Sequence, residues 1–225
     1  MLRRRLIVLS GEAGAGKDSV ANILRDSFGW QHFSLAAPLK RFGKDMFGFT
    51  DEQLYGPSHA RNEPDPRWAR PCDWCHGSGL GKTIHADHCV TCHGTGKIND
   101  NSVRRVLQLL GEEYLRQMIH IDALTMRARP EIDELLTKGE QVVVNDARND
   151  NDRNNLYKWC GGCRVDVRSH RTRVIAKEDE AWRKHISENR QPTDDQLEYV
   201  LRNDEEWPFP SLSHKVEAML AELYG

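Results

Sequence analysis

Short apolar runs alternate along the chain with segments in which apolar residues recur at helical spacing. Residues 6–10 form a run that suits a strand buried on both faces of a parallel sheet, and residues 141–145 and 163–167 are further strands of the parallel type. Helical spacing follows the first run over residues 20–28, and Gly29 supplies a stop. Strands that alternate with helices predict an α/β fold.

Weaker patterns predict the remaining elements of this fold. Two more strands are expected at residues 32–35 and 197–201. Helices are expected at residues 38–47, 51–54, 103–118, 124–136 and 214–223.

The periodic pattern stops between residues 57 and 99, where proline, glycine, histidine and cysteine replace the regularly spaced apolar residues. This stretch holds the only internal repeat, in which residues 72–79 and 89–96 share the form Cys-x-x-Cys-His-Gly-x-Gly. We therefore predict that residues 57–99 are an insertion in a core formed by residues 1–56 and 100–225.

Composition and charge narrow the class of protein. The chain has 225 residues and a formal net charge of −2, so no bulk positive field is available to bind nucleic acid through its phosphates. The longest apolar stretch, residues 6–9, is too short to span a bilayer, and no apolar region of signal-peptide length follows the N-terminal arginines. We expect a soluble cytoplasmic protein with no membrane partner. Six cysteines in three Cys-x-x-Cys pairs favour metal binding or redox chemistry over a disulfide framework.

A glycine-rich segment with a phosphate-loop spacing lies between the first predicted strand and the first predicted helix. Its glycines allow backbone N–H groups to turn inward around phosphates, and Lys17 can reach the β- and γ-phosphates. The alternative is a glycine-rich turn with an exposed lysine. Asp18 replaces the usual hydroxyl residue and Ser19 follows, so the Mg²⁺ contact is open between them. The candidate ATP and Mg²⁺ ligands here are Gly11, Gly14, Ala15, Gly16, Lys17, Asp18 and Ser19.

A carboxylate and an arginine follow the predicted strand at residues 141–145. Asp146 is placed at the carboxyl edge of the sheet, where open α/β folds bind ligands, and is the candidate second carboxylate that organises Mg²⁺. A helix-cap or turn aspartate is the alternative. Arg148 faces the same crevice if the chain turns there.

Six motifs follow one another along the chain and cover most of it outside residues 57–99. The motifs are Gly-Lys-Asp-Ser at 16–19, Leu-Ala-Ala-Pro-Leu-Lys at 35–40, Arg-Arg-Val-Leu-Gln-Leu-Leu-Gly at 104–111, Val-Val-Asn-Asp-Ala-Arg at 143–148, His-Ile-Ser-Glu at 185–188 and Tyr-Val-Leu-Arg-Asn-Asp at 199–204. Together they resemble the phage-type deoxynucleoside monophosphate kinases of the P-loop kinase superfamily. The resemblance implies a P-loop NTPase-type three-layer sandwich with a central parallel sheet. It also implies transfer of the γ-phosphate of ATP, with Mg²⁺, to a (deoxy)nucleoside 5′-monophosphate, and it is compatible with a homodimer.

The acceptor in such a reaction is already a phosphate oxyanion and needs no strong general base, so arginines should dominate the site. Arg105 and Arg148, with Lys40 in support, are the candidates for binding the acceptor phosphate. Gln108, one helical turn from Arg105, is the candidate for reading the acceptor base. For Arg105 the alternative is a solvated basic turn of a helix. The resemblance places Asn203 beside the adenine.

The resemblance also implies a lid over ATP at about residues 168–190. Arg168 and Arg171 are the candidates for supplying cations to the charge that develops during transfer. Together with Lys17 and the Mg²⁺-organising Asp146 they are the candidate catalytic residues. A capping or hydrogen-bonding role for His185 is at least as compatible with the pattern as a role as base.

The insertion carries four thiols at zinc-knuckle spacing, with 13 residues between the two pairs. The repeat is similar to the zinc region of J-domain chaperones, with two copies where that family has four. We predict structural Zn²⁺ because a segment this poor in apolar side chains needs a staple to fold, and we place the insertion near the acceptor-binding region. Haem attachment through the Cys-x-x-Cys-His pattern is a less favoured interpretation. Replacement of a cysteine by His85 or His88 as a metal ligand is also less favoured. The candidate Zn²⁺ ligands are Cys72, Cys75, Cys89 and Cys92.

Three questions stay open at this point. Cys160 and Cys163 are expected to form a reduced turn that enters a strand, with redox chemistry or a second metal site as the alternative. The kinase acceptor is either a free monophosphate or a modified base in DNA or another small phosphorylated molecule. A hypothesis of another class is an ATP-switched binding module that uses its zinc knuckles to engage a partner. The sequence does not predict which base the acceptor carries.

Overall fold

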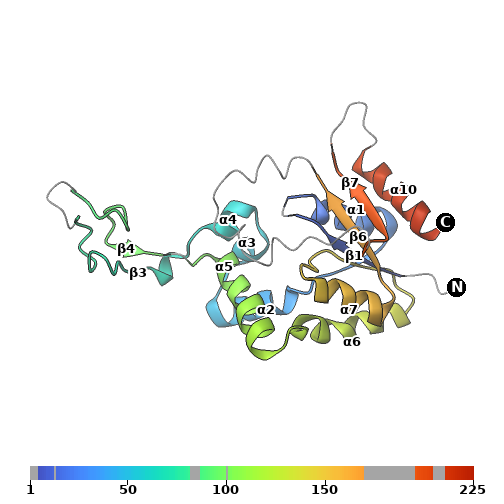
Figure 1. Ribbon diagram of the computed structural model, residues 1–225, viewed down its shortest axis with the longest axis horizontal. Helices are drawn as coiled ribbons and strands as arrows, with labels where there is room; N and C mark the ends of the chain where they lie inside the picture. Colours follow the sequence, from blue (N-terminus) through green and yellow to red (C-terminus); the bar gives the residue numbers. More distant parts are fainter. Residues whose placement is uncertain (1–4, 13, 82–86, 100, 170–195, 205–210) are drawn as a thin grey trace. The chain divides into compact units, whose positions relative to one another are not determined.

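The computed structural model describes residues 5–12, 14–81, 87–99, 101–169, 196–204 and 211–225. The chain divides into two compact units, which are residues 1–38 with 111–225 and residues 39–110. The first unit contains a five-stranded sheet in the order β2-β5-β1-β6-β7, and every strand pair in it is parallel (Figure 1). The strands are β1 (Leu6–Ser10), β2 (Gln31–Phe33), β5 (Val142–Val144), β6 (Cys163–Arg168) and β7 (Tyr199–Arg202).

Strand β1 lies at the centre of the sheet, and all five of its residues are buried. It pairs in parallel with β5 through Leu6↔Val142 and with β6 through Ile7↔Cys163. Helices cover both faces of the sheet, which is why these strands are apolar runs without alternation. The predicted α/β fold with a central parallel sheet is confirmed, and all five strands lie within about two residues of their expected bounds.

Among the described residues, two helices pack on each face of the sheet and complete three layers (Figure 1). Helices α1 (Lys17–Phe28) and α10 (Leu212–Tyr224) share one face, and α6 (Ala123–Thr137) and α7 (Asp150–Cys160) share the other. Alternate residues of β1 point to opposite layers. The first core contains Ile7, Leu9, Val20, Leu24 and Met219, and the second contains Leu6, Val8, Ile132 and Leu156.

The strand order changes direction at β1. From β1 the chain runs to β2 and then to β5 on one side of β1, and from β5 it crosses to β6 on the other side. In open α/β sheets ligands bind at the carboxyl ends of the strands at such a switch point. The glycine-rich segment that follows β1 therefore starts at the position where a ligand site is expected.

Helix α7 is an element that the sequence pattern does not predict. Its buried face contains two charged residues, Asp152 and Arg153, beside Leu156, so the apolar spacing that reveals other helices is missing. The Arg116 guanidinium donates to both Asp152 carboxylate oxygens, at 2.9 and 2.7 Å. Arg116 belongs to the π-helix η2 (Leu109–Ile119), which continues from α5 (Val103–Gln108) where a single helix was expected.

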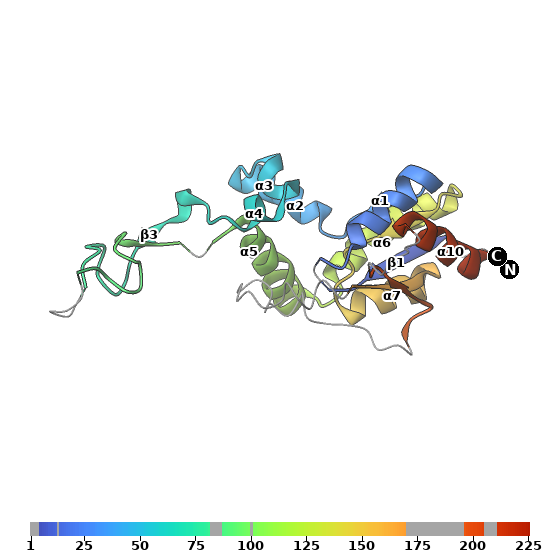
Figure 2. The same cartoon turned by 90° about the horizontal axis from the view of Figure 1, so that it is seen from above.

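The second unit combines four short helices with a cysteine-bearing lobe. Helices α3 (Asp51–Tyr55), α4 (Ser58–Asn62) and α5 contact one another, and α2 (Ala37–Phe47) leads into them (Figure 2). The unit extends beyond the expected insertion at residues 57–99 because the helices that flank the insertion share a core of their own. That core is formed by Phe49, Leu54, Val103 and Val106, with Phe47 and Trp68 packed against it.

The insertion leaves and rejoins these helices as a pair of antiparallel segments. Pro64 bridges to Ser102, and β3 (Arg70–Pro71) then pairs with β4 (Lys97–Ile98) after the short 3₁₀ helix η1 (Pro66–Trp68). None of the helices in the described ranges is long and apolar enough to cross a bilayer.

The buried ion pair between α7 and η2 gives a stability prediction. Asp152→Ala leaves the buried Arg116 guanidinium with only its longer 3.4 Å contact to Glu112 and should lower the free energy of unfolding by about 3–5 kcal/mol. The matched control is Glu131→Ala, which removes the exposed Arg127–Glu131 pair of α6 and should cost less than about 1 kcal/mol. Urea denaturation of both variants checks this, and equal costs would contradict it.

Candidate functional site

The segment after β1 wraps around the N-terminus of α1. Gly14 and Gly16 have φ values of 86° and 100°, and Gly16 is the N-cap of the helix. Gly11 has φ 131°, and a Cβ atom there would lie 2.2 Å from the carbonyl oxygen of Val167. Glycine is therefore required at positions where the backbone turns to present N–H groups at a helix N-terminus, which is the geometry of an anion site.

Lys17 lies over this loop. Its Nζ donates to the carbonyl oxygens of Gly11 and Glu12, at 2.7 and 2.8 Å. Ala15 in this loop is buried, and its carbonyl accepts a hydrogen bond from Asn203 Nδ2 at 3.0 Å. A Cβ atom at Gly16 would lie 2.5 Å from the same Nδ2. The structure thus brings Asn203, which sequence reasoning placed at the adenine, into contact with the phosphate loop.

Asp18 and Ser19 are both exposed at the start of α1. Asn145 directly follows β5, and its Nδ2 donates to Asp18 Oδ1 at 2.6 Å. This contact brings Asp18 to the carboxyl end of β5. Sequence reasoning missed Asn145, although its position at the end of a buried strand was a usable signal.

Both carboxylate oxygens of Asp146 bind the turn between β2 and α2. Oδ1 accepts from the Leu35 N–H at 2.8 Å, and Oδ2 accepts from the Ser34 hydroxyl at 2.6 Å and from the Ala36 N–H at 3.0 Å. These contacts match the turn-aspartate interpretation. Arg148, two residues farther on, is exposed.

Arg168 lies at the end of β6, where its Nε donates to Asp166 Oδ2 at 2.9 Å. Asp166 is buried and also accepts from the Ser10 hydroxyl at 2.8 Å. Sequence reasoning missed Asp166, although a carboxylate within a predicted buried strand is a signal of a fixed polar contact. Arg171 and residues 170–190 of the expected lid lie outside the described residues.

The acceptor candidates are divided between the two units. Arg148 belongs to the first unit, whereas Lys40, Arg105 and Gln108 belong to the second. Lys40 Nζ lies 4.4 Å from the centre of the Tyr55 ring. Arg105 and Gln108 lie one turn apart on α5, and the Gln108 side chain is buried.

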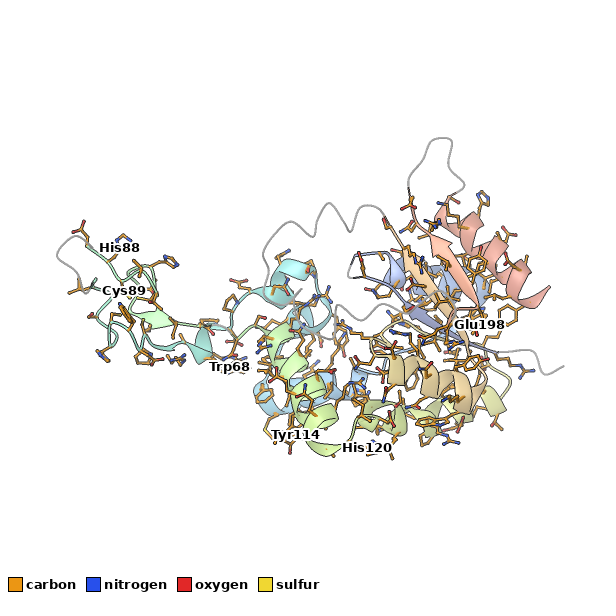
Figure 3. All side chains as sticks on the ribbon, viewed as in Figure 1. Trp68, His88, Cys89, Tyr114, His120 and Glu198 are labelled. Carbon is orange, nitrogen blue, oxygen red and sulfur yellow. The ribbon has the colours of Figure 1, made fainter. Side chains whose placement is uncertain are left out.

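The cysteine lobe, residues 70–98, brings the four predicted metal ligands together. All four thiols are buried, and their Sγ atoms lie within 4.8 Å of one another (Figure 3, where Cys89 is labelled). Cys72 Sγ lies 3.9 Å from Cys89 Sγ, and Cys75 Sγ lies 3.7 Å from Cys92 Sγ. Tetrahedral Zn²⁺ with Zn–S bonds of 2.3 Å separates its sulfur ligands by about 3.8 Å. The cluster therefore fits Zn²⁺, and its spacing is far too long for disulfides.

The two Cys-x-x-Cys turns have the same backbone geometry, and each accepts a backbone hydrogen bond from the other. Cys72 N–H donates to the carbonyl of Gly96 at 2.9 Å, and Cys89 N–H donates to the carbonyl of Gly79 at 2.7 Å. A Cβ atom at Gly79 or Gly96 would lie 2.4 or 2.3 Å from a carbonyl oxygen of the opposite turn. The repeated glycines are thus required by the close approach of the two turns.

The lobe favours thiolate at particular cysteines. Burial opposes ionisation of Cys75, but N–H groups of Gly79 and Gly77 and the neighbouring thiols outweigh it and lower the pKa of Cys75 to about 6. The pKa of Cys89 is also lowered, because backbone N–H groups outweigh the effect of its burial. Thiolate is the form that binds metal ions.

The third cysteine pair has different surroundings. Burial and the nearby Asp133 carboxylate raise the pKa of Cys160 to about 12, so its thiol is protonated at neutral pH. Cys163 is buried on β6, and none of the six cysteines forms a disulfide. These features favour the reduced turn over a redox or metal site.

No family model matches the chain. A curated relative from Acanthamoeba polyphaga mimivirus, provisionally named a deoxynucleotide monophosphate kinase, is 43% identical over 63 residues, which are 28% of this chain and 33% of the relative. The chain thus matches about a third of the length of that relative. The resemblance to deoxynucleoside monophosphate kinases is confirmed over this stretch.

Solved kinase structures align with nearly the whole chain at low identity. Dephospho-CoA kinase from Campylobacter jejuni is 9% identical with a TM-score of 0.45, over 98% of this chain and 97% of its own. Shikimate kinase from Bacteroides thetaiotaomicron is 14% identical with a TM-score of 0.43, over 97% of each chain.

The geometry of the cysteine cluster predicts one bound Zn²⁺ per chain. Cys92→Ser removes one of the four ligands and should lower the zinc content well below one equivalent. Cys160→Ser is the matched control, because this thiol lies outside the cluster and should leave the zinc content unchanged. Atomic absorption of the purified variants measures the stoichiometry. Full zinc retention by Cys92→Ser would rule out a four-thiolate site.

Proposed function

We propose that this chain is a kinase that transfers the γ-phosphate of ATP to a (deoxy)nucleoside 5′-monophosphate and forms the diphosphate. The observation that carries this proposal is the glycine loop after β1, with Lys17 folded over it and Asn203 bound to it, at the switch point of a parallel sheet. The sequence match to the viral deoxynucleotide monophosphate kinase supports the same class of acceptor.

The residues of this chain have two roles toward ATP, which are to bind its phosphates and to neutralise their charge. The N–H groups of the loop and the N-terminus of α1 bind the ATP phosphates, and Lys17 moves from loop carbonyls to the β- and γ-phosphates. When bound with ATP, Mg²⁺ supplies further neutralisation of these phosphates. Asp18 or Ser19 would hold it, and the contact between Asp18 and Asn145 supports Asp18.

Arg168 is the described arginine proposed to stabilise the charge that develops on the transferred phosphoryl group. Asp166 holds the Arg168 Nε and is itself bound by Ser10, the last residue before the phosphate loop. These two hydrogen bonds fix the Arg168 Nε relative to the loop. A preorganised cation needs little rearrangement during the reaction.

Each unit offers candidates for binding the acceptor monophosphate. They are Arg148 in the first unit and Arg105 and Lys40 in the second, where Gln108 is the candidate for reading the base. Guanidinium groups bind phosphate bidentately, and two phosphate groups must be brought together against their repulsion. A buried amide such as Gln108 discriminates between bases that can and cannot complete its hydrogen bonds.

The first test supplies MgATP with each deoxy- and ribonucleoside monophosphate in turn and measures ADP and the nucleoside diphosphate. We expect turnover of one or two monophosphates. Lys17→Ala should lower kcat at least about 100-fold because it removes a cation from the transferred phosphate. The control is Lys138→Ala, whose side chain is exposed and paired with Glu134. Binding of ATP with no turnover of any monophosphate would overturn the proposal.

The second test separates acceptor binding from ATP binding. Arg105→Ala should raise KM for the monophosphate about 10- to 100-fold, as expected for loss of a charged hydrogen-bonding partner, and should leave KM for ATP unchanged. Arg105→Lys should rescue little, because lysine cannot reproduce bidentate phosphate binding. Arg129→Ala, at an exposed pair with Asp133, is the control. An unchanged monophosphate KM would place the acceptor elsewhere.

A further inference from the structure

The chain passes from the first unit to the second between Pro38 and Leu39, and it returns between Leu110 and Gly111. The segment of residues 146–152, which follows β5, hydrogen-bonds to the residues beside both crossings. We call this segment the anchor segment. All contacts described below lie within the first unit.

The first anchor is Asp146. Its carboxylate binds the hydroxyl of Ser34 and the N–H groups of Leu35 and Ala36, at 2.6, 2.8 and 3.0 Å. These three residues immediately precede α2, through which the chain enters the second unit. Hydrogen bonds from N–H groups to a carboxylate are stronger than those to a neutral acceptor, so a single side chain fixes the turn before the crossing.

The second anchor is a buried polar network beside the return crossing. Asn149 Nδ2 donates to Glu112 Oε2 at 3.1 Å, and Arg116 Nε lies 3.4 Å from the same oxygen. Arg116 also donates to both oxygens of Asp152. All four side chains are buried, and Glu112 lies two residues after the return crossing.

The anchor segment is itself braced from α7. The buried Arg153 donates to the carbonyl oxygen of Arg148 at 3.0 Å. Arg148 is therefore presented from a backbone that is held at both ends, by Asp146 on one side and by Asn149 and Asp152 on the other. One short segment thus carries an acceptor arginine and both anchors.

We propose that the anchor segment is a positioning element for the acceptor and that Asp146 is its principal positioning residue. It fixes the backbone from which Arg148 is presented, together with the residues of the first unit that precede α2 and those that follow Leu110. This inference rests on the proposed function. It assigns Asp146 to positioning of the chain and not to Mg²⁺, because its oxygens already serve three donors of the turn.

The experiment compares Asp146→Ala, Asp146→Asn and Ser34→Ala in the full chain. Asp146→Ala removes all three hydrogen bonds and should raise KM for the monophosphate about tenfold or more, since the displaced Arg148 loses charged hydrogen bonding to the acceptor phosphate. Asp146→Asn keeps one acceptor oxygen, and Ser34→Ala removes one donor. The KM for the monophosphate of both variants should therefore lie between the value for Asp146→Ala and that for the unchanged chain. ATP affinity and the Mg²⁺ concentration for half-maximal rate should stay unchanged.

Hydrogen exchange gives a readout that does not depend on turnover. The amides of Leu35 and Ala36 should exchange about tenfold faster in Asp146→Ala, because their acceptor is gone. Amides of β1 should keep their exchange rates, which excludes general unfolding.

The outcomes separate this inference from the proposed function. If the unchanged chain phosphorylates no monophosphate, the proposed function fails. If the chain is active but Asp146→Ala leaves the monophosphate KM unchanged, the positioning role fails. A raised Mg²⁺ requirement without a change in monophosphate KM would instead assign Asp146 to the metal and overturn the inference.

Discussion

The parallel pairing of a completely buried strand is the constraint on which the site depends. Strand β1 has neighbouring strands on both edges and helices on both faces, so the chain stays inside the core until the strand ends at Ser10. There the backbone passes so close to the Val167 carbonyl that only glycine fits at position 11. The phosphate loop, the start of α1 and the contact with Asn203 all follow from this exit.

The parts that sequence reasoning predicted are those whose cause is local. Buried parallel strands, the glycine loop and the paired Cys-x-x-Cys turns each fit within a few consecutive residues, so spacing alone reveals them. The thiols of Cys72 and Cys89, 17 positions apart, meet because two such local turns dock on each other. Composition then favours a metal centre, since the lobe has little apolar surface to bury.

What sequence reasoning did not predict depends on distant polar partners. Asp18 meets Asn145 across 127 positions, and Arg116 meets Asp152 across 36. A buried charge in a helix removes the apolar spacing by which the helix would be recognised, and α7 was missed for this reason. For Asp146 the position at a strand end left a Mg²⁺-organising carboxylate and a turn aspartate as alternatives, and its partners Ser34, Leu35 and Ala36 could be identified only in three dimensions.

The reciprocal closure of the cysteine lobe makes each of its two turns depend on the other. Each turn supplies a carbonyl that the other needs, so half of the lobe has no complete hydrogen-bond pattern of its own. The lobe also enters and leaves through neighbouring segments, at the bridge between Pro64 and Ser102. Each turn therefore completes its hydrogen bonds only when the other is present, while the core of Phe49, Leu54, Val103 and Val106 is built from residues outside the lobe.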